Sequence, residues 1–299
     1  MGKNIIVIGS SNTDMVLKTS RFPRPGETII GGDFFVFQGG KGANQAVAAA
    51  RAGGEVHFIC RVGSDPFGLS AMEHYENEGI DVSGIVKDEK APTGVAVITV
   101  NAEGENSIIV ASGANALLSI KDVAIENLAK ADWLITQLET PLEVIIHLAV
   151  YARAHQKNLV LNPAPAASLP DEVYGELFLI TPNETETTLL TGINVTDESS
   201  AKEAAAVFKT KGVQNVIITM GSKGAYVAAA DFEGMIDSVK VKAVDTTAAG
   251  DVFNGALVVA LSEGKVWKDA VQFACKAAGI SVTKMGAQTS APTRKEIDQ

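Results

Sequence analysis

From about residue 119 onward, the sequence alternates between short apolar segments and longer segments with helical spacing. This alternation is typical of an α/β fold, a doubly wound and mostly parallel sheet flanked by helices. The strands are predicted at 133–138, 158–161, 177–180, 215–219 and 225–229. The helices are predicted at 141–155, 184–190, 199–211, 250–263 and 266–283. Earlier in the chain, residues 4–9 and 56–62 are predicted as strands and residues 66–78 as a helix.

Polar or glycine-rich residues follow several of these strands at the point where the strand ends. In an open α/β sheet, ligands bind in the crevice outside the carboxyl ends of the strands. The sequence therefore predicts a crevice that collects these segments, which are Ser10–Asp14, Glu139, Asn162-Pro163, Thr181-Pro182-Asn183 and Met220–Gly224.

The stretch Asp245–Asp251 is predicted as a tight turn between a strand at 239–244 and a long helix. Residues 248–250 have almost no side chain, so their backbone N–H groups can lie open at the helix start. Such a helix N-terminus attracts an anion through its free N–H groups and its dipole. Asp251 at the same place suits the deprotonation of a hydroxyl that attacks a phosphoryl group. The alternative, equally open from this stretch alone, is an acid that only stabilises the first helical turn.

A second glycine-rich segment, Gln38–Gln45, opens a helix that runs to Arg51-Ala52 and is stopped by Gly53-Gly54. Its three early glycines allow the backbone to approach a ligand closely. The alternative is a glycine hinge before a closely packed helix. Because Lys41 is followed by glycine, the segment is not a Walker A loop, and its spacing does not fit a dinucleotide fingerprint.

Segments 93–100 and 107–110 flank a polar turn and predict a β-hairpin. Two strands alone are marginal in water, so we expect extended segments at 15–18, 28–30 and 34–37 to complete a small sheet. One face of this sheet would lie over the ligand, and a second subunit would cover the other. The predicted domains are an α/β core that holds the nucleotide and catalytic site, formed by residues 1–12, 39–92 and 114–299, and a protruding β-sheet lid formed by residues 13–38 and 93–113.

Composition excludes several classes of partner. The 299 residues carry a net charge of −10, which argues against nucleic-acid or anionic-membrane binding. No apolar run approaches the length of a membrane span, and residues 4–9 are too short for a signal-peptide core. Cys60 and Cys275 are predicted to be buried thiols of a cytoplasmic protein. The histidines are scattered without metal-ligand spacing, and the terminal helix near Gln299 is expected to be cut short.

Several motifs, in their order and spacing, resemble the ribokinase family of carbohydrate kinases over essentially the whole chain. They are Gly39-Gly40-Lys41-Gly42-Ala43-Asn44, Asn162-Pro163-Ala164-Pro165, Thr181-Pro182-Asn183-Glu184-Thr185-Glu186, Asp245–Asp251 and Gly286-Ala287-Gln288. The family commonly has glycine where Ala248 stands, and alanine there keeps the backbone donors. The resemblance implies a ribokinase-like fold and transfer of a phosphoryl group from ATP to the 5-hydroxyl of D-ribose, giving D-ribose 5-phosphate.

The resemblance also implies roles for individual residues. Asp251 matches the family's general base. The N–H groups of Ala248, Ala249 and Gly250 match its anion hole, which holds the transferring phosphoryl group. The implied ribose ligands are Asn12, Thr13, Asp14, Gly40, Lys41, Gly42, Ala43, Asn44, Glu139 and Asp251. The implied ATP ligands are Asn183, Glu186, Thr219, Met220, Gly221, Ser222, Lys223, Gly224, Gly250, Asp251 and Cys275. Glu186 would also help to place magnesium, and the alternative for residues 183–186 is a capped helix start, which is compatible with that role.

An activating monovalent cation, usually potassium, is a further implication of the resemblance. Its implied ligands, mostly backbone carbonyls, are Asp245, Thr247, Ser281, Lys284, Gly286 and Ser290. The family's β-lid commonly pairs in a homodimer. Two other functions stay open at this point. One is a sibling sugar or nucleoside kinase, such as a 2-deoxyribose kinase, and the other is a non-catalytic regulator that binds ribose or nucleotide. The pair Asn12 and Asp14 favours a sugar with its full set of hydroxyls.

Overall fold

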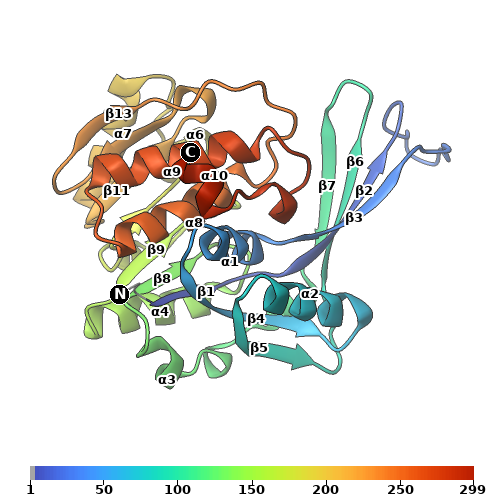
Figure 1. Cartoon of the computed structure of the whole chain (residues 1–299), viewed down its shortest axis with the longest axis horizontal. Coiled ribbons are helices and arrows are strands. Elements are labelled where there is room, and N and C mark those ends of the chain that lie inside the picture. Colours follow the sequence, from blue (N-terminus) through green and yellow to red (C-terminus); the bar gives the residue numbers. More distant parts are fainter. Residues whose placement is uncertain (1–3) are drawn as a thin grey trace.

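The computed structural model describes residues 4–299, which form a nine-stranded central sheet and a separate four-stranded sheet (Figure 1). Residues 1–3 of the predicted core lie outside this part of the chain. The strands of the central sheet are β1 Asn4–Ile8, β4 Glu55–Gly63, β5 Asp81–Asp88, β8 Trp133–Thr136, β9 Asn158–Leu161, β10 Leu179–Ile180, β11 Asn215–Thr219, β12 Ala225–Ala228 and β13 Glu233–Ile236. Their order is β13-β12-β11-β10-β9-β8-β1-β4-β5, and among these strands β12 alone runs antiparallel to the rest.

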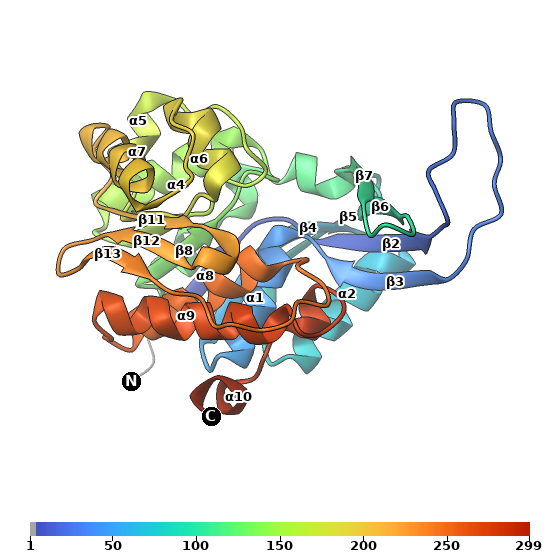
Figure 2. The same ribbon diagram turned by 90° about the horizontal axis from the view of Figure 1, so that it is seen from above.

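Helices cover both faces of this sheet, as Figure 2 shows. One face carries α1 Lys41–Arg51, α2 Pro66–Asn77, α8 Ala249–Ser262, α9 Trp267–Ser281 and α10 Arg294–Asp298. The other carries α3 Ile125–Leu128, α4 Leu142–Ala154, α5 Asp171–Tyr174, α6 Glu184–Thr191 and α7 Glu198–Thr210. Short 3-10 turns are η1 Gly113–Leu117, η2 Ile120–Asp122, η3 Gly221–Lys223 and η4 Gln288–Ser290. Each face has its own apolar core, so the predicted doubly wound α/β fold is confirmed.

The close packing of α1 on α8 positions the site. Both helices are rich in small residues, and a Cβ on Gly255 would lie 2.7 Å from the backbone oxygen of Gln45. Only glycine permits this approach, because any larger residue would push the helices apart. The first turns of the two helices therefore meet at the carboxyl end of the sheet.

The second sheet projects from the core, as Figure 1 shows. Its strands are β2 Asn12–Lys18, β3 Phe34–Gly39, β6 Gly94–Val100 and β7 Asn106–Ala111, in the order β3-β2-β6-β7. Asn12 pairs with both Gly39 and Gly94. The ends of β2, β3 and β6 at which the chain passes between the two sheets therefore lie side by side. Apolar side chains at least half exposed lie along the two outer strands of this sheet, β3 and β7, and they are Phe34, Val36, Ile108, Ile109 and Val110.

Two predicted strands are wrong. Thr28–Ile30 forms no strand, and the Ile30 side chain is fully exposed. Residues 239–244 also form no strand, and Val239, Val241 and Val244 are each more than two-fifths exposed. In both places the sequence alternates as a strand does, but no neighbouring strand pairs with it. Alternation gives a strand only where one face packs on other residues.

The sequence analysis also missed β5 and β13, both at the sheet edges. Gly84 interrupts β5 and weakens its strand pattern. The glycine is required there, because a Cβ would lie 2.7 Å from Nε2 of His57 in β4. In addition, β2 begins at Asn12, so the last three residues of the polar segment Ser10–Asp14 belong to a strand.

Candidate active site

The first turn of α8 lines a cavity of about 220 Å³. Ala248 precedes the helix with φ 59° and ψ 11°, in the left-handed region that disfavours L-residues by about 1–2 kcal/mol. This turn of the backbone opens the helix start toward the cavity. The lining residues are Lys41, Asn162, Ala164, Thr181, Asn183, Glu186, Thr219, Thr246, Ala248, Ala249, Gly250, Asp251 and Asn254.

Asp251 is 5% exposed, and its carboxylate is held from α1 rather than used as a cap of its own helix. Asn44 Nδ2 donates to Oδ2 at 2.9 Å, and Gln45 Nε2 donates to Oδ1 at 3.0 Å. A first-turn acid that served only the helix dipole would need neither contact. The geometry thus presents a fixed carboxylate in the first turn of α8, where the Ala249 N–H donates to the Thr246 oxygen at 3.3 Å.

Three charged groups gather near Asp251 on the side of the second sheet. Burial, with the nearby Glu139 and Asp251 carboxylates, raises the pKa of Asp14 to about 7. The Asp251 carboxylate raises the pKa of Lys41, although burial opposes this shift. Glu139 accepts hydrogen bonds from Ser10 Oγ at 2.5 Å and from the Lys41 backbone N–H at 3.0 Å. Acids and one cation at this spacing suit a ligand with several hydroxyl groups.

Glycines bring the start of α1 against the end of β1. Gly40 has φ 89°, and a Cβ there would lie 2.7 Å from the Asn12 backbone nitrogen. A Cβ on Gly42 would lie 2.6 Å from the Ser10 nitrogen. The Ala43 N–H donates to the Ser10 oxygen at 2.9 Å. This contact places the first turn of α1 next to the polar end of β1, as the glycine-rich motif predicts.

Several amide and hydroxyl groups near the same place are buried. Asn12 Oδ1 accepts from Asn115 Nδ2 at 2.8 Å, and Asn115 also bonds the Ser11 backbone. Thr13 Oγ1 and Asn44 Oδ1 are buried without a hydrogen-bond partner among residues 4–299. Buried polar atoms normally find partners. These two atoms are therefore candidates for contact with a polar ligand.

On the other side of the cavity, Asn183 and Glu186 form a capping box at the start of α6. Glu186 N–H donates to Asn183 Oδ1 at 2.8 Å, and Asn183 N–H donates to Glu186 Oε2 at 2.9 Å. The capped helix start is thus confirmed. Burial raises the pKa of Glu186, and this side chain also lines the cavity. An acid so placed could contribute to holding a divalent cation bound to phosphates.

Thr219 and Asn183 form a parallel bridge, and the loop that follows Thr219 closes on itself. Met220 N–H donates to the Gly224 oxygen at 2.8 Å, and η3 contains Ser222 and Lys223. Gly221 and Gly224 both have positive φ. Met220–Gly224 and Cys275 lie outside the cavity lining. Cys275 is buried in α9, and burial raises the pKa of its thiol to about 12, while Cys60 is likewise buried and free.

Asp245 joins the turn before α8 to the loop after α9. Its Oδ1 accepts from Thr247 N–H and its Oδ2 from Gly286 N–H, both at 2.9 Å. Although burial raises the pKa of Asp245, these hydrogen bonds outweigh it and lower the pKa below its usual value. An ionised carboxylate between two loops fits a nearby monovalent cation held by backbone carbonyls. Of the other residues implied for this site, Ser281 and Ser290 donate to nearby backbone oxygens, and Lys284 pairs with Glu296 at 2.7 Å.

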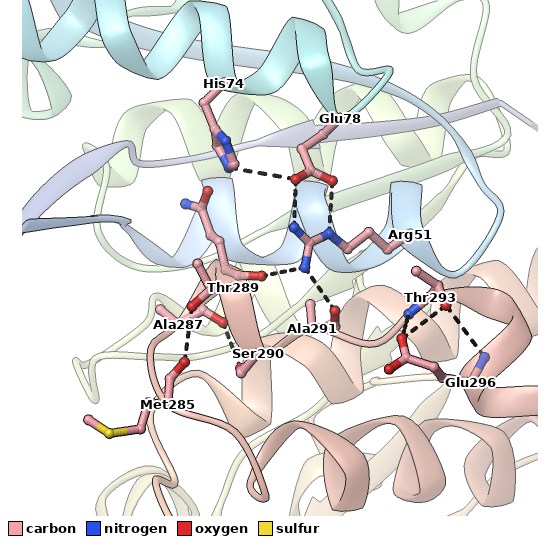
Figure 3. A network of polar contacts seen from close by, with 11 residues as sticks. Arg51, His74, Glu78, Met285, Ala287, Thr289, Ser290, Ala291, Thr293 and Glu296 are labelled. Carbon is pink, nitrogen blue, oxygen red and sulfur yellow. Dashed lines mark hydrogen bonds and ion pairs between the residues drawn. The ribbon is translucent and has the colours of Figure 1, made fainter.

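Arg51, at the end of α1, also holds the loop that follows α9 (Figure 3). Its guanidinium forms a two-bond pair with Glu78 at 2.8 and 2.6 Å. It also donates to the backbone oxygens of Gln288 and Ala291, both at 2.9 Å. The side chains of this pair are about one-fifth exposed, and His74 Nε2 lies 4.0 Å from Glu78. Sequence reasoning missed this anchor, because a single arginine in an alanine helix gives no motif.

The structure also brings residues to the site that the sequence analysis did not assign to it. Gln45 contacts Asp251 directly. The sequence did not indicate this role, because Gln45 directly follows the glycine-rich motif in a helix of small residues. Thr181 Oγ1 donates to Asn254 Oδ1 at 2.6 Å, and Asn254 Nδ2 donates to the Gly250 oxygen at 2.8 Å. The strand-end pattern predicted the segments of Asn162 and Thr181, but not their individual roles. Ser10, Ser11, Ala164 and Thr246 likewise lie in predicted segments or motifs without an individual role, and Asn115 was missed altogether.

Comparison with known proteins agrees with this fold. Residues 2–294 match the profile of the pfkB family carbohydrate kinases. A ribokinase of Haemophilus influenzae is 47% identical over 298 residues, which cover 99% of this chain and 97% of that protein. The crystal structure of a Thermotoga maritima ribokinase is 41% identical with a TM-score of 0.90, and covers 100% of this chain and 98% of its own. The structure of an Arabidopsis thaliana ribokinase complexed with ribose and ATP is 31% identical with a TM-score of 0.92, over 99% and 98% of the chains.

The fold, the cavity and these matches define a sugar kinase, which is a phosphotransferase. The chain belongs to the pfkB family of carbohydrate kinases. No helix in residues 4–299 is both long and apolar enough to cross a membrane.

Proposed function

We propose that the protein transfers the γ-phosphoryl group of ATP to the 5-hydroxyl of D-ribose, giving D-ribose 5-phosphate and ADP. The observation that carries this proposal is the position of Asp251. Its carboxylate lines the cavity with Lys41 of α1, on one face of the sheet, and with Asn183 and Glu186 at the start of α6, on the other face; Asp14 is close enough for Asp251 to raise its pKa. A sugar and a nucleotide that approach from these two sides would meet at Asp251. The matched ribokinases, one of them complexed with ribose and ATP, support this choice of substrates.

In this mechanism Asp251 accepts the proton of the 5-hydroxyl, and the oxygen forms its bond to the γ-phosphorus as the bond to ADP breaks. Phosphoryl transfer needs positioning and charge stabilisation more than a strong base. The N–H groups of Ala248 and Gly250 would donate to the oxygens of the transferring group, and the Ala249 N–H would join them on leaving the Thr246 oxygen. Lys41 adds positive charge next to Asp251.

Two metal ions belong to the proposal. Glu186, with Asn183 beside it, would hold a magnesium ion bound to the ATP phosphates, which neutralises phosphate charge. Asp245 and the backbone of Thr247 and Gly286 would hold a monovalent cation, and the ionised Asp245 between the two loops supports this. In the transfer itself, these residues fix the loop that leads into the α8 N-terminus.

An ADP-release assay with a panel of sugars, with and without potassium, tests this function. We expect turnover on ribose that falls when potassium is replaced by a bulky organic cation. We expect kcat/KM on 2-deoxyribose to be about ten- to a hundredfold lower, because a missing hydroxyl leaves buried polar groups without a partner.

Each alternative gives a different result in that experiment. Faster turnover on 2-deoxyribose than on ribose would assign the protein to a sibling activity. Ribose binding by isothermal titration without any ADP release would identify a non-catalytic regulator. The buried Asn12 and Asp14 favour ribose, because Asn12 supplies an amide and Asp14 a carboxyl group for the sugar hydroxyls.

We further propose that the four-stranded sheet acts as the lid of the sugar site and pairs with the same sheet of a second chain. The strand register places Val36, Val97 and Ile109 in one row across the sheet, with Phe34 on the same face. This exposed apolar face supports the pairing, because a monomer rarely leaves a contiguous apolar face in water. Sedimentation equilibrium at micromolar concentration is expected to give twice the mass of the chain. Replacing Ile109 with Lys should then favour the monomer, and a wild-type monomer would contradict the proposal.

A further inference from the structure

A chain of buried amides lies beneath the Asp251 carboxylate. Gln45 is fully buried in α1, and its Nε2 donates to Asp251 Oδ1 at 3.0 Å and to Asn162 Oδ1 at 3.1 Å. Its Oε1 accepts from Gln137 Nε2 at 2.7 Å. Asn162 Nδ2 in turn donates to the backbone oxygen of Thr181 at 3.2 Å. Both donors and the acceptor of the Gln45 amide are therefore used.

Groups that cannot flip fix the orientation of these amides. The Thr181 backbone oxygen only accepts, so the Asn162 Nδ2 must face it and the Asn162 Oδ1 must face Gln45. An ionised Asp251 carboxylate also only accepts. Turning the Gln45 amide over would place its oxygen against two acceptors and its nitrogen against the Gln137 donor. The Gln45 and Asn162 amides thus have one orientation each, and Gln137 Oε1 is the one oxygen of these three amides that is buried without a partner among the described residues.

Space for this network is built into the sheet. Gln137 directly follows β8 and is fully buried. A Cβ on Gly9, at the end of β1, would lie only 2.1 Å from Gln137 Oε1. Glycine at this position leaves room for the Gln137 side chain, which connects the sheet to Gln45 and through it to Asp251.

The two oxygens of Asp251 differ in how they are held. Gln45, whose amide is fully partnered, binds Oδ1. Asn44 binds Oδ2, and its own Oδ1 is buried without a partner among the described residues. Asn44 is also placed to contact a sugar. When a sugar arrives, Asn44 can exchange partners, whereas Gln45 cannot do so without breaking the network.

We propose that Gln45 is a positioning residue, which fixes Asp251 through Oδ1 so that Oδ2 faces the substrate hydroxyl, and that Gln137 orients Gln45 for this task. The inference rests on the proposed kinase function. Neither glutamine touches the reacting atoms. A displacement of a catalytic group by about 1 Å can cost about a hundredfold in rate, so this support should appear in kcat.

The test compares Gln45→Met and Gln137→Met with a matched control, Asn215→Leu. Methionine keeps the length of glutamine and removes its hydrogen bonds. Asn215 is also a buried amide, which donates to the Phe178 oxygen at 2.9 Å, but it lies at the start of β11, at the opposite end of that strand from the cavity-lining Thr219. The measurements are kcat and KM for both substrates, the pH dependence of kcat, and the melting temperature.

We expect Gln45→Met to lower kcat about a hundredfold and Gln137→Met about tenfold, with the KM for ATP within about twofold of wild type. The acidic limb of the pH profile should move to higher pH in Gln45→Met, because loss of a donor favours the protonated carboxyl. Lys41, Asp14, Glu139 and Glu186 also face this region and are unchanged in all variants. Asn215→Leu should lower the melting temperature without moving the pH profile.

The outcomes separate this inference from the proposed function. If the wild type phosphorylates ribose and both glutamine variants keep wild-type kcat and pH profile, Gln45 has no positioning role and the kinase function stands. If the wild type phosphorylates no sugar, the proposed function itself fails. If Gln45→Met is recovered unfolded, Gln137→Met decides the question. That variant keeps the contact between Gln45 and Asp251 and removes only the hydrogen bond by which Gln137 orients Gln45. An unchanged kcat in that variant would overturn the inference.

Discussion

Asp251→Asn is expected to lower kcat by about 10²–10⁴-fold, the range that a positioned general base contributes. An amide cannot accept the proton of the sugar hydroxyl. ATP binding should change little, because the nucleotide side of the cavity, with Asn183 and Thr219, keeps its contacts. The measurements are steady-state kinetics and a titration of ATP binding by calorimetry.

Asp269→Asn provides the matched control, because Asp269 is an exposed acid in the first turn of the next helix, α9. If Asp251 served only the helix dipole, the two variants would behave alike, each losing about 0.3–1 kcal/mol of stability. We expect full activity from Asp269→Asn. Equal activity of both variants would remove Asp251 from the mechanism.

Gly42→Ala is expected to cost about 1–3 kcal/mol of folding free energy and to weaken sugar binding. The new Cβ would lie 2.6 Å from the Ser10 nitrogen and 2.7 Å from the Gly9 carbonyl carbon. These are backbone atoms that cannot rotate away, so the start of α1 must move. Alanine is otherwise the better helix former by about 1 kcal/mol, and the clash must exceed that gain. Urea unfolding measures the stability and a ribose titration measures the affinity.

The control for this variant is Gly175→Ala. Gly175 ends α5 with φ −65°, and the nearest atom to its added Cβ, the Lys211 oxygen, lies 3.9 Å away. Alanine fits this backbone, so stability should be unchanged or rise by about 0.4–1 kcal/mol. A Gly42→Ala protein as stable as Gly175→Ala would show that α1 does not pack on β1 as described.

The sequence predicted the fold and the general position of the site because both follow from repeated local patterns. Alternating strands and helices imply a sheet with polar residues at its carboxyl edge, and Glu139 and Asn162 lie there. The glycines of the first motif predicted the close approach that Gly40 and Gly42 make. Asp251 was found as an acid next to small residues at a helix start.

What the sequence could not show depends on contacts between distant elements. Gln45 has no pattern of its own, and its role appears only when α1 packs on α8. The prediction of a strand at 239–244 was wrong, because the sequence does not show whether a neighbouring strand is there to pair with it. Strand β5 was missed because Gly84 lowers its strand propensity, although that glycine exists to make room for His57.

The hydrogen bond between Asn44 and Asp251 joins residues 207 positions apart in the chain. During synthesis, the sugar-side residues leave the ribosome long before their partner. Contacts of such long range form late, because chain entropy must first be overcome. A nascent chain that lacks α8 therefore cannot assemble the catalytic contact, and a fragment ending before residue 249 should have no activity. Activity thus reports completed folding of both ends of the molecule.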